Sequence, residues 1–309
     1  MVRYIIFRLL RVIAIVLVVI FILFVLLYTL PGSRVGTIPI SGYGDALDDI
    51  FESLNVKDGL LTKYIRYCYN VFVHFSFKSS PDTRYRTVSL IRARTLTTVY
   101  ILVCGLALTL ILGVPIGVYT AIRKNRPADR LINSILMLAS SIPSYSIALL
   151  ILLVFCAYLK ILPVIVAPRT PVSYIMPTLT VAISGMSSVA RMTRAYMLEV
   201  LEQPYITALR AKGIKESSVI YRHALKNALI PIISFLRGFS AQLLCGTLVV
   251  EQFFTLPGIG MHLLGAVSTR NHDDLLGGAV VMTIILALMN IVSDVAYAVF
   301  NPQIRLKAE

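Results

Sequence analysis

The feature that most constrains this chain is a series of long stretches without a single charged residue. Residues 12–33, 95–122 and 131–159 contain no Lys, Arg, Asp or Glu. About 20 consecutive apolar residues cross the hydrocarbon core of a bilayer as a helix. A helix also bonds its own backbone N–H and C=O groups where no water is available to do so. The stretches therefore predict an all-α membrane protein.

The composition agrees with this prediction and bears on the net charge. Hydrophobic residues make up 57% of the chain and charged residues 14%, whereas about 25% of an ordinary soluble domain is charged. The net charge of +14 could indicate a nucleic-acid-binding protein. Many of the basic residues, however, flank the apolar stretches, where cytoplasmic loops retain positive charge. We therefore predict a lipid bilayer as a partner and no nucleic acid.

The charge pattern predicts six transmembrane helices and their direction. Arg3, Arg8 and Arg11 precede the first stretch, and Arg123 begins a basic turn after the second. Both termini are then cytoplasmic, and the spans at 95–122 and 174–196 both run inward. The chain divides into an N-terminal segment with helix 1 (1–33), an extracytoplasmic insertion (34–94), a core (95–300) and a cytoplasmic tail (301–309). The core helices are expected at about 95–122, 131–159, 174–196, 228–250 and 276–300, with a cytoplasmic loop at 199–226.

The cytoplasmic loop contains a short predicted helix that ends in a glycine. Pro204 suits the first helical position, where its missing N–H costs nothing. Tyr205, Ala208, Leu209 and Lys212 share one helical face by their spacing, and Gly213 is suited to the left-handed conformation that ends a helix. A second helical run starts near Ser217 and continues into the apolar residues around Pro231. The loop therefore predicts a small cytoplasmic docking element.

This loop resembles the cytoplasmic "EAA" loop of permease subunits of ATP-binding-cassette (ABC) importers. Thr207-Ala208-Leu209 stands at the Glu-Ala-Ala triplet and Gly213 at its glycine. The glutamate is absent, and Leu209–Gly213 is closer to the variant in dipeptide and oligopeptide permeases. Leu225 is followed by Lys226 where the general pattern has Leu-Pro, and the proline comes at Pro231.

Two further motifs carry the same resemblance, which extends from about residue 95 to residue 305. Ser140–Ser144 is similar to the family's Ser-Ile-Pro motif. A second stretch is similar to its Glu-x-x-Phe-x-x-Pro-Gly-x-Gly turn, with the matching residues Glu251, Phe254, Pro257, Gly258 and Gly260. Such a turn serves the fold as readily as a function. Pro143 would bend its span, as a plain kink or as part of the gate, and Ser141 accompanies it as a pathway candidate.

The resemblance implies a type I ABC importer permease in the inner or plasma membrane of a bacterium or archaeon. It implies four partners: a second homologous permease subunit, two ATPase subunits and an extracytoplasmic substrate-binding protein. ATP and Mg would bind to the ATPase subunits, and no cofactor to this chain. The substrate would be di- or oligopeptides, with nickel chelates, glutathione or oligosaccharides as alternatives. The residues implied to couple to the ATPase are Tyr205, Thr207, Ala208, Leu209, Arg210, Ala211, Lys212 and Gly213, of which Arg210 and Lys212 would offer charge to it.

The chain lacks the motifs of the enzymes that it might otherwise be. It contains no Gly-x4-Gly-Lys-Ser/Thr phosphate loop and no His-Glu-x-x-His zinc motif, and no Gly-x-Ser-x-Gly elbow. Gly42–Asp45 matches the GxGD motif of intramembrane aspartyl proteases, which need a second membrane aspartate; a turn is favoured here. We predict no catalytic, cofactor-binding or metal-binding residue. An ion-coupled carrier would show acidic residues within its spans and inverted repeats, and neither pattern stands out.

Ionisable residues lie in or beside the later spans. A lone charge at mid-membrane costs about 2.5–3.5 kcal/mol, so Arg237, Glu251 and Asp294 each need a partner or water. Arg237 and Asp294 are expected at overlapping depths in their spans and are predicted to pair. Alternatively, Arg237 contacts an anionic substrate or extends to the lipid headgroups.

Overall fold

The computed structural model describes residues 2–29, 60–74, 84–162, 170–269 and 272–300, and within these ranges it contains helices and no strand. The prediction of a helical protein is confirmed for this part of the chain. The helices form two compact units, which are described separately. Unit 1 comprises residues 1–98 and 257–287, and unit 2 comprises residues 99–256 and 288–309.

Unit 1 is built around an apolar core shared by three helices. These are α1 (Val2–Thr29), α3 (Leu60–His74) and the first part of α12 (His272–Phe300). The Tyr64 hydroxyl donates a hydrogen bond to the Leu17 carbonyl oxygen over 3.1 Å, which joins α3 to α1. The unit also contains α11 (Ile259–Ser268) and the start of α4 (Arg84–Ile122). The buried core consists of Val16, Ile20, Phe24, Tyr67, Val71, Leu276 and Val280.

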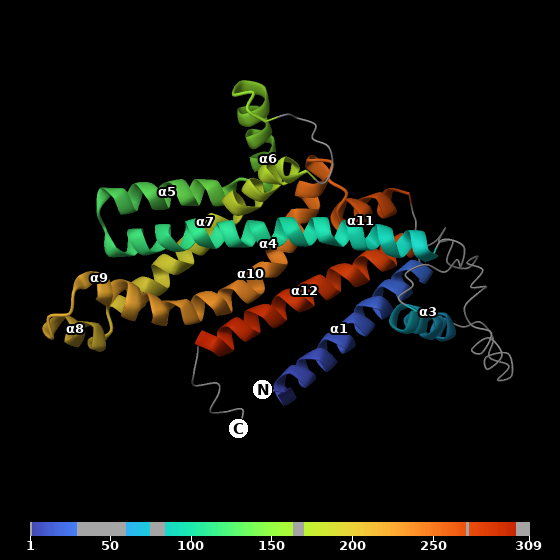
Figure 1. Ribbon diagram of the computed structural model, residues 1–309, viewed down its shortest axis with the longest axis horizontal. Helices are drawn as coiled ribbons and strands as arrows, with labels where there is room; N and C mark the ends of the chain where they lie inside the picture. Colours follow the sequence, from blue (N-terminus) through green and yellow to red (C-terminus); the bar gives the residue numbers. More distant parts are fainter. Residues whose placement is uncertain (1, 30–59, 75–83, 163–169, 270–271, 301–309) are drawn as a thin grey trace. The chain divides into compact units, whose positions relative to one another are not determined.

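Unit 2 contains the remainder of α4, the helices from α5 to α10 and the last part of α12 (Figure 1). Helix α5 (Pro127–Ser141) lies beside α4, and α6 (Ser144–Leu152) continues as a π-helical turn at Leu153–Tyr158. A 3-10 turn at Pro171–Tyr174 leads into α7 (Ile175–Leu201). The segment after α7 holds α8 (Pro204–Ala211), α9 (Glu216–Ser218) and a second π-helical turn at Val219–Ala224. Helix α10 (Leu225–Phe253) follows.

The expected bend at Pro143 is larger than a kink. Helices α5 and α6 meet at 102° across the break between Ser141 and Ser144. Proline removes a backbone donor and disfavours helical geometry in the residue before it. Ile142 accordingly adopts an extended conformation. The span expected at 131–159 is therefore two helices.

The described residues contain four helices long and apolar enough to cross a membrane, or five if the bent pair is one span. The single helices are Ile91–Ile122, Pro171–Leu201, Glu216–Phe253 and Asp274–Tyr297. Within α1, the apolar helical segment Val12–Leu26 is shorter than these. Helix α4 begins at Arg84, earlier than expected, so the segment 34–94 contains α3 and the first residues of α4. The tail 301–309 and the Gly42–Asp45 motif lie outside the described residues.

Helices α4 and α7 pack closely through small residues in unit 2. Contacts recur every four residues along both helices in the same direction, so α4 and α7 are parallel. The sequence predicted that these two spans run in the same direction. A Cβ atom added at Gly117 would lie 2.5 Å from the Ala190 carbonyl oxygen. Small residues allow this close approach, which drives helix association where lipid removes the hydrophobic effect. The contacts join Gly105 to Val181, Thr109 to Gly185, Gly113 to Val189 and Gly117 to Thr193.

We predict that Gly117→Ala destabilises the protein by about 1–3 kcal/mol, because the added methyl group overpacks a contact with backbone atoms. Thermal unfolding of the detergent-solubilised protein measures the loss. Gly238→Ala in α10 is the matched control, since a Cβ there meets nothing within 4 Å and alanine favours a helix. Equal unfolding temperatures for both variants would contradict the packing described here.

Candidate functional site

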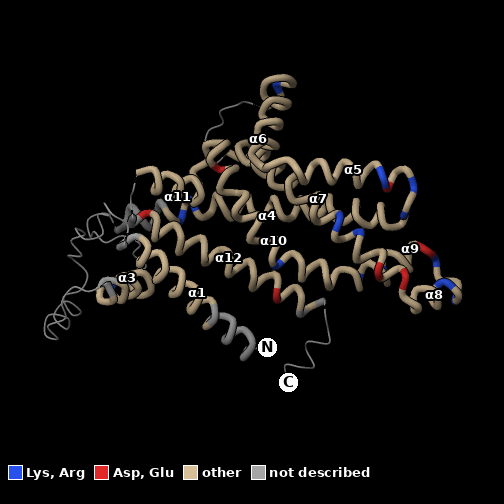
Figure 2. The backbone as a smooth tube through the Cα atoms, turned by 180° about the vertical axis from the view of Figure 1, so that it is seen from behind, with Lys and Arg blue, Asp and Glu red and all other residues tan. Residues whose placement is uncertain are grey.

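Charged residues of unit 2 gather at one end of its helices. Figure 2 shows Lys, Arg, Asp and Glu around α8, α9 and the adjoining ends of α5 and α7, and few charges along the middle of the helices. Charges concentrate in this way where helices leave the membrane. The candidate site begins at this end, with α8.

Both ends of α8 are set by local sequence, as predicted. Gln203 is in an extended conformation and Pro204 occupies the first turn. At the other end Gly213 has φ of +71°. Its N–H donates to the Arg210 carbonyl oxygen over 2.9 Å, and the N–H of Ile214 donates to that of Leu209 over 3.3 Å. These two bonds form a Schellman motif, which explains why a glycine stands here.

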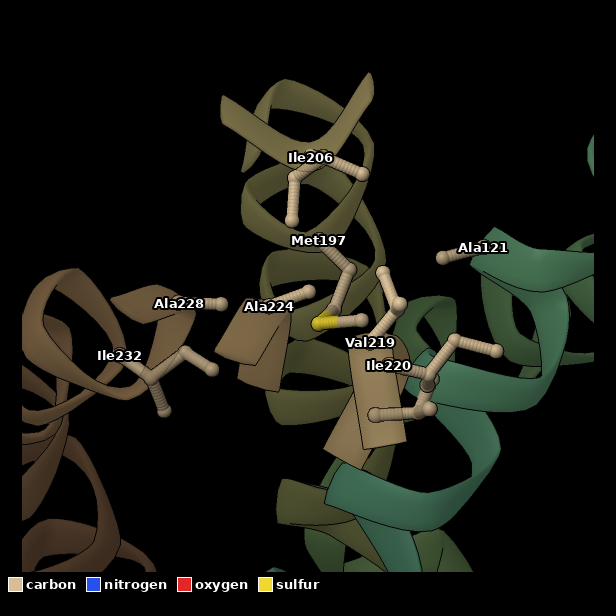
Figure 3. Close-up of a cluster of buried hydrophobic side chains, with 9 residues drawn as sticks. Ala121, Met197, Ile206, Val219, Ile220, Ala224, Ala228 and Ile232 are labelled. Atoms are coloured by element: carbon tan, nitrogen blue, oxygen red, sulfur yellow. The ribbon is translucent and has the colours of Figure 1, made fainter. Parts of the chain in front are cut away.

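A single side chain, Ile206, anchors α8 to the rest of unit 2. It is 0% exposed and lies in an apolar cluster, hereafter the Ile206 cluster, which Figure 3 shows with residues of α4, α7 and α10 converging beneath α8. Leu209 packs against the same cluster. Sequence analysis missed Ile206, although its spacing of three from Leu209 was a usable signal. The buried members are Val118, Ala121, Met197, Ile206, Val219, Ile220, Ala224, Ala228 and Ile232.

The opposite face of α8 is open. Tyr205 is 38% exposed, and its hydroxyl oxygen accepts a hydrogen bond from Asn227 Nδ2 over 2.7 Å. Of the predicted face, Leu209 alone is turned partly inward. The outward residues are Tyr205, Thr207, Ala208, Arg210, Ala211 and Lys212.

Arg210 carries a charge that is already paired within the chain. Its Nη2 and Nε atoms donate to the two carboxylate oxygens of Glu216 over 2.8 and 3.1 Å. This fork joins α8 to α9. Lys212 is also exposed on this face, and the offer of charge to a partner by Arg210 and Lys212 stays a prediction.

A buried ion pair joins the start of α5 to the C-terminal part of α7. Arg194 donates from Nε and Nη2 to the two oxygens of Asp129, each over 2.8 Å. Asp129 is 2% exposed, and it also accepts hydrogen bonds from the Asn125 N–H and from Asn133 Nδ2. This set satisfies both carboxylate oxygens, the condition under which a buried charge is tolerated. Sequence analysis did not indicate this pair.

A second, exposed pair crosses the same two segments. Lys124 Nζ lies 2.7 Å from Glu202 Oε1. The hydrogen bond from Lys124 lowers the pKa of Glu202 below its usual value. Any contribution of this pair to stability is therefore fully present at a pH above the usual pKa of a glutamate, and it is lost as the pH falls through the lowered pKa. The turn after α4 is thus tied to α7 twice, close to where α8 begins.

At the Pro143 break, unit 2 contains a cavity of about 400 Å³. Residues of the break, of α7 and of α10 line it, and none of the lining residues is charged. The predicted candidate Pro143 is part of the lining and Ser141 is not. Sequence analysis did not predict the α10 side of the cavity. The polar lining residues are Ser140, Ser144, Ser184, Ser188 and Gln242.

The other two pathway candidates form the predicted ion pair. Arg237 Nη1 lies 3.4 Å from Asp294 Oδ1. The Asp294 side chain is 10% exposed and that of Arg237 is 54% exposed. Neither residue lines the cavity. The pair reduces the cost of two charges within the helices, and a further role in the pathway stays a prediction.

The signature turn begins at the end of α10. Glu251 is 0% exposed, and its carbonyl oxygen accepts a hydrogen bond from the Leu256 N–H over 2.9 Å. Thr255 has φ of +53°, a conformation that strains a β-branched residue. Phe254 packs against residues of α6 and α7. The remaining signature residues are Pro257 and the buried Gly258 and Gly260 that flank the start of α11.

The geometry defines a class of protein before any comparison. Apolar helices long enough to cross a bilayer, a short helix anchored at their charged end and an uncharged cavity between them indicate a helical membrane protein. Among the described residues, no three His, Cys, Asp or Glu side chains lie together as a metal site would need.

Comparison with known proteins gives the family. Residues 113–306 match the binding-protein-dependent transport system inner membrane component family, and the chain belongs to it. The protein is thus a multi-pass membrane permease subunit of the ABC importer family.

Relatives and a solved structure agree with this assignment. The chain is 34% identical over 202 residues to the dipeptide transport system permease protein of Bacillus subtilis, covering 65% of each chain. It is 30% identical over 308 residues to the glutathione transport system permease protein of Escherichia coli, covering 99% of this chain and 100% of the relative. Its fold is similar to that of a chain of the inward-facing MetNI methionine ABC transporter, with a TM-score of 0.58 at 18% identity, covering 70% of this chain and 98% of that one.

We predict that Asp129→Asn lowers the free energy of unfolding by about 3 kcal/mol, because it leaves the Arg194 charge without its partner. This is the low end for a buried pair, since the Arg194 side chain is 25% exposed. Thermal unfolding in detergent measures the change. Glu202→Gln serves as control, because the pair that it removes is exposed and screened by solvent. Equal shifts in the two variants would show that burial of Asp129 does not matter.

Proposed function

We propose that this chain forms half of the membrane pathway of an ATP-driven importer of di- or oligopeptides. One observation carries the coupling role: α8 is anchored by Ile206 and bound by Schellman and ion-pair contacts, yet its outer face is open. The peptide substrate is supported by the loop variant Leu209–Gly213 and by the dipeptide permease relative.

The proposed topology is the six-span arrangement of a type I importer. The N-terminal segment 1–33 and the tail 301–309 have cytoplasmic ends, and segment 34–94 is extracytoplasmic. The core 95–300 carries the coupling loop 199–226. The basic turn after α4 and the basic loop around α8 support this orientation, because positive charge marks the cytoplasmic side. The membrane would be the inner or plasma membrane of a bacterium or archaeon.

Coupling would begin where α8 rests in a groove of an ATPase subunit, a common mode of helix recognition. Two ATPase subunits, one for this chain and one for a second homologous permease subunit, would bind ATP with Mg and close. The Ile206 cluster makes α8 move with the inner ends of α4, α7 and α10. The Asp129–Arg194 pair adds α5 to this group. A rigid-body movement of the spans follows.

The cavity at the Pro143 break is the proposed pathway element on this chain. Helix α5 connects it to the coupling end, since α5 begins beside Asp129 and ends at the break. An extracytoplasmic binding protein would deliver the substrate from the other side. Among the pathway candidates, Pro143 lines the cavity and is the proposed gate residue. The other candidates, Ser141, Arg237 and Asp294, lie outside the lining.

Glutathione is a second candidate substrate. The observation that favours it is the Escherichia coli relative, which matches this chain over 99% of its length. Glutathione is itself a modified tripeptide with free carboxylates, so both candidates present amide groups to the pathway. Competition between labelled glutathione and unlabelled tri-alanine during uptake would separate the two.

We predict that Gly213→Pro abolishes uptake while ATP hydrolysis continues. Proline fixes φ near −65°, whereas Gly213 has φ of +71° and donates its N–H to Arg210. Gly213→Asn is the control, because asparagine tolerates the left-handed conformation; it should retain most of the uptake. The measurement compares peptide uptake and ATP hydrolysis in reconstituted vesicles. Normal uptake by the proline variant would show that the end of α8 does not transmit movement.

We also predict that Ala208→Cys forms a crosslink to an ATPase subunit, because Ala208 lies on the open face of α8. Ser268 is exposed on α11, the helix that follows α10 in the chain. A cysteine introduced there by Ser268→Cys should form no such crosslink. Bifunctional thiol reagents on intact membranes, followed by immunoblotting, test both. Labelling of the thiol introduced by Ala208→Cys with an impermeant reagent added outside the cell would place the loop on the wrong side and refute the coupling role.

A further inference from the structure

The cavity at the Pro143 break offers polar groups without charge. The Ser140 hydroxyl donates to the Met137 carbonyl oxygen over 2.9 Å, and the Ser184 hydroxyl donates to that of Thr180 over 2.8 Å. Each hydroxyl group therefore donates its hydrogen to the backbone, and its oxygen can still accept a hydrogen bond from another donor. Val181 and Phe239, 3% and 4% exposed, form apolar parts of the wall.

Gln242 is the side chain best placed to contact a ligand. It is exposed and lines the cavity from α10. A primary amide has two N–H donors and one carbonyl acceptor. Phe239, Gln242 and Gly246 follow one another at three- and four-residue spacing, which places them on one stripe of α10. Gln242 thus adds a donor to a wall in which the serines supply acceptors.

This lining selects a class of ligand. An ionic group would find no opposite charge among the lining residues. A wholly apolar ligand would cover serine and glutamine groups without bonding them, which costs about 1–3 kcal/mol for each buried group. The interior of a peptide chain, between its charged termini, presents uncharged N–H and C=O groups in alternation and meets both conditions. The volume of about 400 Å³ falls in the range of small-molecule sites.

We propose that this cavity binds the amide backbone of a peptide in transit, with Gln242 pairing with a peptide N–H and C=O group. The inference rests on the proposed function and deepens it, since it names the chemical group that is recognised. Recognition of the backbone does not depend on which side chains the peptide carries. Gln242 is therefore a residue that selects for peptide amides and not for a particular sequence.

A four-arm uptake experiment tests the proposal in cells that carry the whole transporter. Wild type and Gln242→Leu are each given tri-alanine and tri-alanine methylated on the amide nitrogen of its central residue. Wild type should prefer the unmethylated peptide, and the leucine variant should lose about 2–10-fold of that preference, the value of one neutral hydrogen bond. Because every arm uses the same binding protein, its own preference cancels in the comparison. Gln252→Leu, an exposed glutamine of α10 outside the cavity lining, should keep the wild-type preference.

The native Cys245 provides a second measurement that does not depend on the Gln242 variant folding. Cys245 is exposed and lines the cavity. In a variant with the other three cysteines replaced by alanine, tri-alanine should slow the labelling of Cys245 by a maleimide, and the methylated peptide should slow it less. Equal protection by both peptides, or none, would overturn the proposal.

The outcomes separate this inference from the function on which it rests. If wild type takes up both peptides and Gln242→Leu reduces both equally, the cavity shapes the pathway without reading the amide, and the inference is wrong. If wild type takes up neither peptide although the complex hydrolyses ATP, the peptide importer assignment fails and the inference falls with it.

Discussion

The burial of Ile206 is the interaction on which the charged end of unit 2 depends. A helix as short as α8 is not stable by itself, because helix nucleation is costly and few bonds follow it. Its structure must come from packing against something larger. Ile206 supplies this by entering a cluster to which α4, α7, the π turn and α10 all contribute. Burying a side chain of this size stabilises by about 1.5–3 kcal/mol. The open face of α8 exists because the opposite face is held so firmly.

The ion pairs around this cluster differ in what they contribute. The exposed Lys124–Glu202 and Arg210–Glu216 pairs add little stability, because solvent screens them. The Asp129–Arg194 pair is different in kind, since one partner is nearly inaccessible. In such a pair the attraction between the charges only about offsets the cost of removing them from water. An arrangement that leaves one of the charges buried without its partner is strongly destabilising. Its effect is therefore to fix how α5 meets α7. Specific geometry comes from this pair, and stability comes from the apolar cluster.

Local rules account for what the sequence predicted well. The bend at Pro143 and the helix end at Gly213 follow from the backbone chemistry of single residues, and no knowledge of the fold is needed. The Arg237–Asp294 pair was predictable because a membrane restricts the depth of each charge. Ile206, the partner of Asp129 and Gln242 were missed because each requires knowing which helix faces meet. Asp129 and Arg194 stand 65 residues apart, and no sequence spacing links them. Membrane length rules predicted six spans, yet they did not separate α5 from α6, since both belong to one uncharged stretch.

The π-helical turn at Val219–Ala224 has a consequence for how the two ends of this long helical run are oriented. A π turn holds one more residue than an α turn, so side chains beyond it are rotated by about 100° relative to an uninterrupted α-helix. The face of α10 that carries Gln242 therefore points in a different direction about the helix axis than it would if the helix before Val219 continued without the π turn. Loss of one residue from this turn would rotate Gln242 away from the cavity and would also rotate Ala228 and Ile232 out of the Ile206 cluster. The extra residue therefore aligns the packing beneath α8 and the lining of the cavity at the same time.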